Sequence, residues 1–182
     1  MLITTARLVL RRFRESDGET LAAYRSDPAV ARYQSWEAPV TLEQGRSVAA
    51  SFAGGDADLP GWFQYAIEHA ADRTHVGDVG VHLDGNLMQA EIGYTLAPAY
   101  QGRGLAGEAV GAVLDHLFRV RGLHKVSAEC DARNVASAAL LERLGFTREG
   151  LRRSHTWIKN EWTDDLLFGL LQAEWSGGAQ PS

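Results

Sequence analysis

The part of the sequence that most constrains the fold runs from Glu91 to Val110, where a strand, a glycine-rich turn and a helix are predicted in succession. Apolar residues alternate with small or polar ones as far as Leu96, which is typical of a half-buried strand. Pro98 then ends the strand, because proline has no N–H to donate. Beyond the turn, apolar residues recur with helical spacing and form one stripe: Ala106, Val110, Val113, Leu114, Leu117 and Phe118.

The junction between that strand and that helix predicts an anion-binding site. The turn, residues 101–106, reads Gln-Gly-Arg-Gly-Leu-Ala. Free backbone N–H groups and the positive end of the helix dipole converge at such a turn, and glycines without Cβ atoms let a phosphate come close. The turn lacks the Gly-Lys-Ser/Thr of a P-loop, and the strands before it read as antiparallel, unlike a dinucleotide fold. We interpret it as the pyrophosphate site of a cofactor; the alternative is that the glycines only shape a turn.

The remaining periodicities predict an α+β chain. Strands are expected over 7–13, 62–69, 76–83, 88–96, 125–130, 147–153 and 166–171, and helices over 17–24, 41–52, 104–120 and 134–144, with a short helical turn at 27–28. Turn signals at 72–73 and 84–86 make the strands around them antiparallel, whereas the helix over 104–120 makes 125–130 parallel to 88–96. We therefore expect a mixed, mostly antiparallel, twisted sheet of about seven strands flanked by helices.

Composition narrows the class of protein. At 182 residues the chain fits one domain over 1–175, followed by a small, polar tail over 176–182 that we expect to be disordered. A net charge of −5 argues against a nucleic-acid partner. The single cysteine favours the cytoplasm, and we see neither a signal peptide nor a membrane-spanning run of about 18 apolar residues. The six histidines show no ligand spacing, so no metal is expected.

Three segments resemble, in order and spacing, the motifs of the GNAT N-acetyltransferase superfamily. Residues 101–106 match its Q/R-x-x-G-x-G/A signature, residues 133–137 its R-N-x-x-S motif, and residues 144–150 its L-G-F-x-x-E-G motif. Residues 5–11, T-x-R-L-x-L-R, resemble the branch that contains the ribosomal-protein N-terminal acetyltransferases. The resemblance implies a GNAT-like acyl-CoA N-acyltransferase fold with a splayed mixed sheet.

The resemblance also implies an acetyl-CoA site. The amides of residues 102–106 would cradle the pyrophosphate, and the main chain of residues 94–96 would pair with the pantetheine arm like an added strand. Asn134 would hydrogen-bond the cofactor, cap the next helix, or do both. The residues expected to bind the cofactor are Tyr94, Thr95, Leu96, Gln101, Gly102, Arg103, Gly104, Leu105, Ala106, Asn134 and Ser137.

Two residues are the candidates for catalysis. Glu91, at the start of the strand beside pantetheine, would accept the amine proton directly or through water; the alternative is a solvated strand-end glutamate. Glu149 is a second candidate base, or a structural residue paired with an arginine. Ser137 matches the motif serine and would hydrogen-bond the leaving thiolate, or it satisfies the helix N-terminus. Leu141 occupies the place of the tyrosine acid of many GNAT enzymes, and residues 154–156 read Ser-His-Thr where relatives carry an acidic residue.

The acceptor is expected to be a primary amine, either a protein N-terminal α-amine or a small-molecule amine, that attacks the thioester directly in a ternary complex. Tyr33 and Trp36 lie in the segment that covers the acceptor site in this superfamily, where they would bind the acceptor or pack in the core. Cys130 is expected to be a buried small hydrophobic residue.

Two alternative functions stay open: a non-catalytic acyl-CoA-binding or regulatory module, which Leu141 favours, and an aminoglycoside-type antibiotic acetyltransferase. The family resemblance admits a homodimer, which no residue pattern of this chain indicates.

Overall fold

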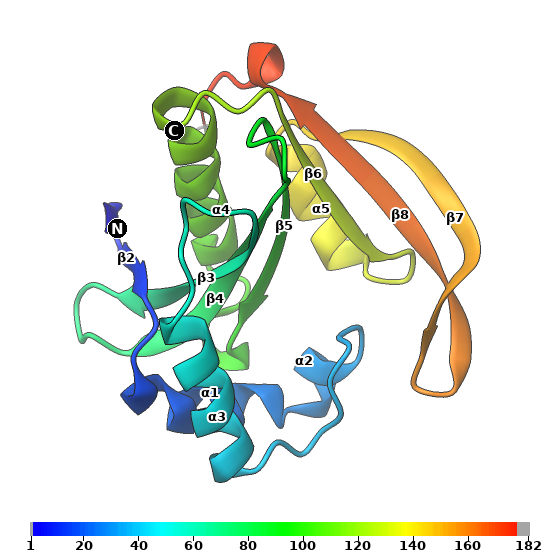
Figure 1. The fold of residues 1–182 in the computed structure, drawn as a ribbon. Helices are drawn as coiled ribbons and strands as arrows, with labels where there is room; N and C mark the ends of the chain where they lie inside the picture. Colours follow the sequence, from blue (N-terminus) through cyan, green and yellow to red (C-terminus); the bar gives the residue numbers. More distant parts are fainter. Residues whose placement is uncertain (1, 178–182) are drawn as a thin grey trace.

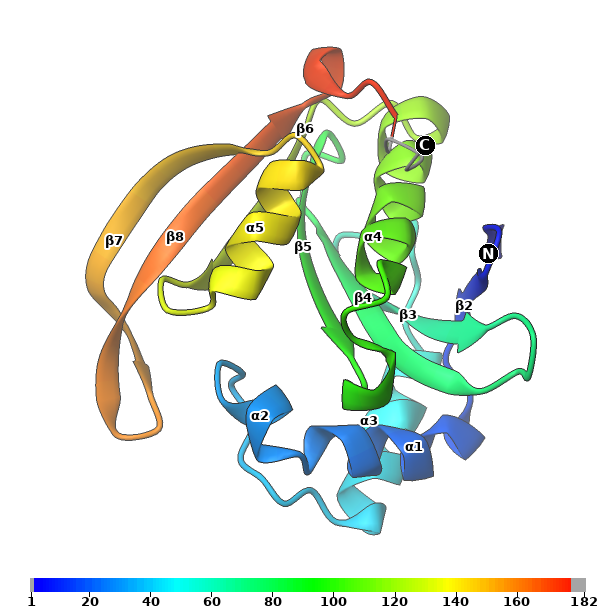
Figure 2. The same cartoon turned by 180° about the vertical axis from the view of Figure 1, so that it is seen from behind.

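The computed structural model describes residues 2–177, so the expected tail over 176–182 lies outside the described range from residue 178 onwards. Eight strands form one sheet in the order β1-β2-β3-β4-β5-β6-β8-β7 (Figures 1 and 2). The strands are β1 (Ile3–Thr4), β2 (Leu8–Arg12), β3 (Gly61–His69), β4 (His75–Leu83), β5 (Gln89–Leu96), β6 (Lys125–Asp131), β7 (Thr147–Ile158) and β8 (Glu161–Leu171). The parallel pair is β5 with β6, and the other neighbours run antiparallel. The expected mixed, mostly antiparallel α+β fold is confirmed, with one strand more than predicted.

The helices flank this sheet. They are α1 (Gly18–Arg25), α2 (Pro28–Ala31), α3 (Leu42–Ala53), α4 (Leu105–Asp115) and α5 (Val135–Arg143), with short 3-10 turns η1 (Glu15–Asp17), η2 (Pro98–Tyr100) and η4 (Gln172–Glu174). A π-helical turn, η3 (His116–Val120), extends α4 to the length predicted from the apolar stripe. The capping box predicted before α3 is present: Thr41 accepts from the Gln44 amide, and the Gln44 side chain accepts from the Thr41 amide. No helix within residues 2–177 is long and apolar enough to cross a membrane.

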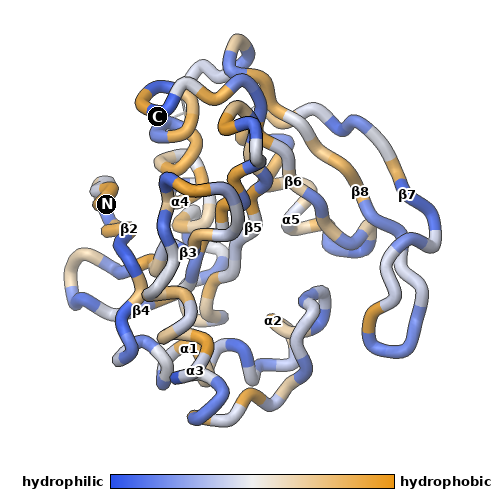
Figure 3. Tube along the Cα trace, in the orientation of Figure 1, coloured by the Kyte–Doolittle hydropathy of each residue, from blue (hydrophilic) through white to orange (hydrophobic). Residues whose placement is uncertain are grey.

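Two apolar clusters lie on opposite faces of the sheet. The larger one is built between α4 with η3 and the central strands, and it includes the residues of the predicted stripe from Val110 to Phe118, all fully buried. Tyr65 and Ile67 of β3 belong to this cluster, whereas Ala66 between them belongs to the smaller cluster with α1 and α3. Figure 3 shows the apolar residues concentrated in α4 and the central strands, while the outer part of β7 is mostly hydrophilic. The sheet is therefore anchored at its centre, and its last hairpin projects from the body.

That hairpin is where the predicted strand lengths are wrong. Strands were expected to end at residue 153 and to resume at 166, but β7 continues to Ile158 and β8 begins at Glu161. Lys159 and Asn160 form the turn with φ of 49° and 62°, so both residues adopt the left-handed conformation without a glycine to signal it. A register shift between Arg152 and Thr156 interrupts the pairing, which hid the alternation of a regular strand.

The strands β5 and β6 pair over four residues and then separate. The last pair is Ile92 with Ala128, and beyond it the β6-facing edge of β5 has no strand partner within the described chain. Figures 1 and 2 show the two strands diverging from this point, with α5 lying beside the gap. The splayed sheet implied by the family motifs is thus present, and it opens next to the glycine turn.

Candidate active site

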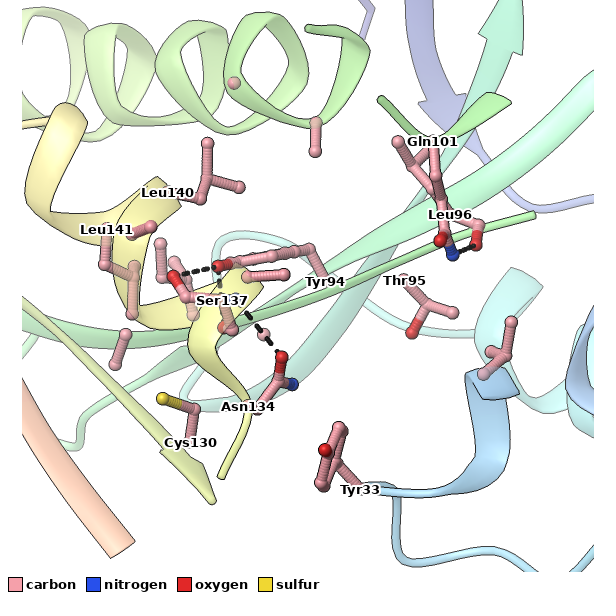
Figure 4. Close-up of a pocket in the computed structure, with 18 of the residues that line it drawn as sticks. Tyr33, Tyr94, Thr95, Leu96, Gln101, Cys130, Asn134, Ser137, Leu140 and Leu141 are labelled. Atoms are coloured by element: carbon pink, nitrogen blue, oxygen red, sulfur yellow. Dashed lines mark hydrogen bonds between the residues drawn. The ribbon is translucent and has the colours of Figure 1, made fainter. Parts of the chain in front are cut away.

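The separation of β5 and β6 creates a cleft of about 680 Å³. Its walls are the end of β5, the glycine turn, the end of β6 and α5, and its floor includes Gly93, where an added Cβ would meet no atom of the described residues within 4 Å. Figure 4 shows the side chains that converge on it from these elements. Ten of the expected cofactor-binding residues line the cleft: Tyr94, Thr95, Leu96, Gln101, Gly102, Gly104, Leu105, Ala106, Asn134 and Ser137. Arg103, the eleventh, does not line it and has its guanidinium 5.7 Å from the Tyr100 ring centroid.

The glycine turn has the backbone shape that an anion site requires. Gly102 and Gly104 have φ of 71° and 75°, a region that residues with a Cβ rarely adopt. Gly104 is the N-cap of α4 and has no side chain to accept from the first-turn amides. Those amides have no intrahelical acceptor either, so they are free to donate to a bound group. Gln101 fixes the entry to the turn, since its Nε2 donates to the Leu96 carbonyl at 2.9 Å.

A pair of hydroxyls bridges β5 and α5 across the cleft. The Tyr94 hydroxyl lies 2.8 Å from Ser137 Oγ and 3.2 Å from the Ser137 carbonyl oxygen (Figure 4). Burial raises the pKa of Tyr94 to about 12, so the phenol stays protonated and acts as a hydrogen-bond donor at neutral pH. Asn134 caps α5, because its Oδ1 accepts from the Ser137 amide at 3.2 Å, and its Nδ2 remains to donate to a ligand. The capping half of the Asn134 prediction is confirmed.

Two carboxylates of β6 line the cleft, and the motif analysis singled out neither: Asp131 pairs with Arg133 at 2.7 Å, whereas Glu129 is the candidate base. Burial raises the pKa of Glu129, and the charges of Asp165 and Glu91 raise it further against the opposing effect of Arg152. Glu91 itself is exposed at the paired part of β5, beside Ser127, and is not among the described residues that line the cleft. Because Glu91 and Ser127 are partners in register and side chains repeat every second residue, Glu91 and Glu129 lie on the same face of the sheet.

Glu129 also belongs to a polar cluster with the last hairpin. The Arg152 guanidinium donates to Glu129 at 2.9 Å and lies 3.2 Å from His155 Nε2. Glu129, His155 and Asp165 hold ligand-type atoms within 4.8 Å of one another, a spacing that a metal ion also uses. Asp165 accepts from the Thr156 hydroxyl at 2.6 Å. Because the Arg152 guanidinium already pairs with Glu129, we interpret the cluster as an ion-pair network that orients Glu129.

The segment of residues 32–39 closes one end of the site. Tyr33 lines the cleft and its hydroxyl donates to the Arg133 carbonyl at 3.3 Å. Trp36 is partly buried and packs on the smaller core, with the Arg25 guanidinium 4.1 Å from its ring centroid. Lys159 at the hairpin turn donates to the Trp36 carbonyl at 2.7 Å. Of the two predicted acceptor-site aromatics, only Tyr33 is therefore brought to the cleft wall.

Two further predictions concern single residues. Glu149 was expected to be a base or to pair with an arginine, but it binds Lys125 Nζ at 2.7 Å. Cys130 is only half-buried and lines the cleft rather than being enclosed in the core, because β6 has already left β5 at that position. Burial raises the pKa of the Cys130 thiol, so it stays uncharged at neutral pH.

Sequence reasoning missed Glu129 and the Tyr94 hydroxyl. Glu129 lies two positions beyond Ser127, on the same face of the strand, and the register that pairs Ser127 with Glu91 is what brings Glu129 to the wall of a cleft opening beyond Glu91; the sequence alone does not give that register. Tyr94 was assigned a role for its main chain alone. The reach of its side chain to α5 depends on how closely that helix approaches β5, which no local pattern records.

Comparison with known proteins agrees with this geometry. A family model described as acetyltransferase (GNAT) domain matches residues 7–147. A Bacillus subtilis strain 168 protein described as uncharacterized N-acetyltransferase YoaA is 31% identical over 172 residues, which cover 94% of this chain and 97% of that protein. The ribosomal protein uS5-alanine N-acetyltransferase of Escherichia coli strain K12 is 32% identical over 94 residues, which cover 52% of this chain and 48% of that protein. A crystal structure of a GNAT-family acetyltransferase from Bacillus anthracis superposes with a TM-score of 0.87 at 29% sequence identity. The superposition covers 96% of this chain and 100% of that one.

Proposed function

Because the chain belongs to the GNAT family of N-acetyltransferases, we propose that it transfers the acetyl group of acetyl-CoA to a primary amine in a ternary complex. The observation that carries this proposal is the open edge of β5 beyond Ile92, placed next to a turn whose first-turn amides are capped by no side chain at Gly104. An extended, amide-rich arm followed by a pyrophosphate needs such an edge and such a turn in that order.

The cleft residues fit acetyl-CoA. The main chain of residues 94–96 would pair with pantetheine, and the amides of residues 102–106 would hold the pyrophosphate. The Asn134 Nδ2 and the Ser137 hydroxyl add donors on the opposite wall, and the Tyr94 hydroxyl adds one from β5. When bound, acetyl-CoA supplies an activated acetyl thioester.

The Tyr94–Ser137 hydroxyl pair would stabilise the departing thiolate. The Tyr94 hydroxyl has a single hydrogen to donate. When it donates that hydrogen to Ser137 Oγ, the hydroxyl hydrogen of Ser137 is free to point into the cleft. A serine hydroxyl is a weak acid, so we assign it hydrogen bonding to sulfur rather than full proton transfer. The pair would thereby fill the role left open by Leu141, whose side chain carries no donor.

A carboxylate would keep the attacking amine neutral. A protein α-amine has a pKa of about 7.7–8.0 and a lysine amine about 10.4, so most of either is protonated at neutral pH. Glu129 lines the cleft and its pKa is raised, which makes it a better proton acceptor at neutral pH than an ordinary glutamate. Glu91 remains the second candidate base on the same face, acting through water.

The acceptor would enter on the face that carries Glu91 and Glu129, past the segment of residues 32–39. The similarity to a ribosomal protein uS5-alanine N-acetyltransferase favours a protein N-terminal α-amine, and carboxylates on this face suit an acceptor with a positive charge. A small-molecule amine, including an aminoglycoside-type antibiotic, is the alternative acceptor class. We further propose that the protein works in the cytoplasm, as its lone cysteine suggests.

The test is release of CoA thiol from acetyl-CoA with a panel of amines: basic and neutral N-terminal peptides, lysine peptides, polyamines and aminoglycosides. Turnover with one class identifies the acceptor. Calorimetry with CoA alone is run in parallel, because tight CoA binding without turnover on any amine would favour the non-catalytic CoA-binding module. Absence of CoA binding would remove the proposed function altogether.

A further inference from the structure

One carboxylate ties the chain between β1 and β2 to the first turn of α4. Glu108 Oε1 accepts from the Thr5 hydroxyl at 2.5 Å and from the Arg7 amide at 2.8 Å. Its Oε2 accepts from Arg7 Nε at 2.6 Å. Burial alone would raise the Glu108 pKa, but these hydrogen bonds outweigh it and lower the pKa below the usual value, so the carboxylate is charged at neutral pH.

Arg7 continues from this carboxylate to the glycine turn. Its Nη1 donates to the Arg103 carbonyl at 2.9 Å, and its Nη2 lies 3.5 Å from the position that a Cβ on Gly104 would occupy. Glycines on both sides of Arg103 make this turn conformationally permissive, since each can leave its positive φ at little steric cost. Fixing the carbonyl between them restricts the turn to the shape in which its amides face the cleft.

We propose that Arg7 and Glu108 form a clamp that holds the glycine turn in its phosphate-binding shape, which makes Arg7 a positioning residue for the cofactor. This inference rests on the proposed function, because it takes the phosphate to be that of CoA. Arg7 acts through the Arg103 carbonyl, and its side chain is 48% exposed, so it contributes little to the packed core.

Electrostatics alone predicts the opposite effect for Glu108. A charged carboxylate in the first turn of a helix repels an anion bound at that N-terminus, so its removal should tighten CoA binding. The clamp predicts weaker binding, because Arg7 loses its anchor. A ligand phosphate bound directly by Arg7 also predicts tighter binding for Glu108→Gln, since the guanidinium would be freed from its partner. The sign of the change therefore decides between the explanations.

The experiment compares Arg7→Met and Glu108→Gln with the wild-type protein. We expect each variant to bind CoA about tenfold more weakly by calorimetry, the effect of losing roughly one charge-assisted hydrogen bond. In steady-state assays KM for acetyl-CoA should rise by a similar factor with kcat nearly unchanged, while KM for S-acetylpantetheine, which lacks the phosphates, should stay constant. Hydrogen exchange in the ligand-free variants should become faster in the peptide that contains residues 102–106.

Arg12→Met is the matched control, because Arg12 ends the strand β2 that follows Arg7 and donates to the Ala53 carbonyl of α3 instead of the glycine turn; its CoA affinity should equal that of the wild type. Unchanged or tighter CoA binding by Glu108→Gln would overturn the clamp. An equal rise in KM for acetyl-CoA and for S-acetylpantetheine would also overturn it, since it would indicate that the substitution disturbs the fold of the site as a whole. If the wild type itself fails to bind CoA, the proposed function fails instead.

Discussion

Replacement of Ser137 by alanine tests the hydroxyl pair most directly. The change removes Oγ, which lies 2.8 Å from the Tyr94 hydroxyl, and leaves the Ser137 main chain to accept from Tyr94 and to donate to Asn134. The helix cap and the tyrosine position are therefore retained. The variant loses the hydroxyl whose hydrogen would point at the departing sulfur, together with its contacts to Tyr94 and Cys130.

The size of the effect follows from the kind of hydrogen bond that is lost. A hydrogen bond to a charged group contributes about 1.5–3 kcal/mol. Because about 1.4 kcal/mol corresponds to a factor of ten in rate, kcat should fall roughly 10- to 150-fold. KM for acetyl-CoA should change little, since the charge on sulfur develops only during the reaction. Tyr94→Phe should lower kcat by a smaller factor, because Ser137 keeps its hydrogen but loses the partner that orients it.

The assay is thiol release from acetyl-CoA at saturating acceptor, with CoA affinity measured separately by calorimetry. Ser127→Ala is the matched control: its hydroxyl donates to the Ala90 carbonyl at 3.3 Å, and within the described chain it does not line the cleft. The double variant should lose less than the product of the two single effects, because the residues act as one unit. An unchanged kcat in Ser137→Ala, or effects that simply multiply, would refute the role of the pair.

Three further outcomes are expected. Glu129→Gln should lower kcat/KM about a hundredfold or more. It should also abolish the acid limb of the pH–rate profile, whose apparent pKa should lie above the ordinary glutamate value of 4.5. Glu91→Gln should have the smaller effect on kcat/KM, and pH–rate profiles of both variants check this. Gly104→Val should weaken CoA binding measured by calorimetry, because a side chain at φ 75° costs about 1–2 kcal/mol or more in the bound turn. Arg11→Met should reduce the free energy of unfolding in urea by about 3–5 kcal/mol, since it removes the buried guanidinium that pairs with the buried Asp17 and Glu68 carboxylates and leaves Glu68 only the exposed Arg73 and Arg14. Burial would raise the pKa of Asp17, but hydrogen bonds from Arg11 and from the Arg14 amide lower it below 3.8, so this stabilisation is present above the unfolded-state pKa and is lost as the pH falls through the lowered value.

The sequence predicted those parts of the fold whose signals are local. The helix after Gly104 follows from the periodicity of its apolar stripe and is present, and Gly104 at its N-cap has the positive φ that a glycine permits. The long hairpin was underestimated because its turn, Lys159 and Asn160, adopts positive φ without a glycine. A polar strand that projects from the body also has no apolar face to reveal its period.

Those parts of the site that are formed by contiguous sequence motifs were predictable. The edge of β5, the turn and Asn134 belong to continuous motifs, so their assembly at one cleft followed from the order of the elements. The side chains that we propose for catalysis depend on tertiary distances instead. Glu129 acquires its raised pKa from burial and from charges on β5 and β8, and Tyr94 meets Ser137 only because α5 packs beside the splayed strands.

The pairing of β6 has a consequence for how the protein is made. All seven residues of β6 pair with β8, whereas only four pair with β5, so β6 is held in the sheet mainly by a strand that is synthesised some thirty residues later. A ribosome-bound chain ending before Glu161 would already contain the glycine turn but would lack a secured far wall carrying Glu129, Asn134 and Ser137. Capture of a CoA-type ligand would thus report that translation has passed β8, and a nascent-chain series with increasing length should acquire CoA affinity in one step at that strand.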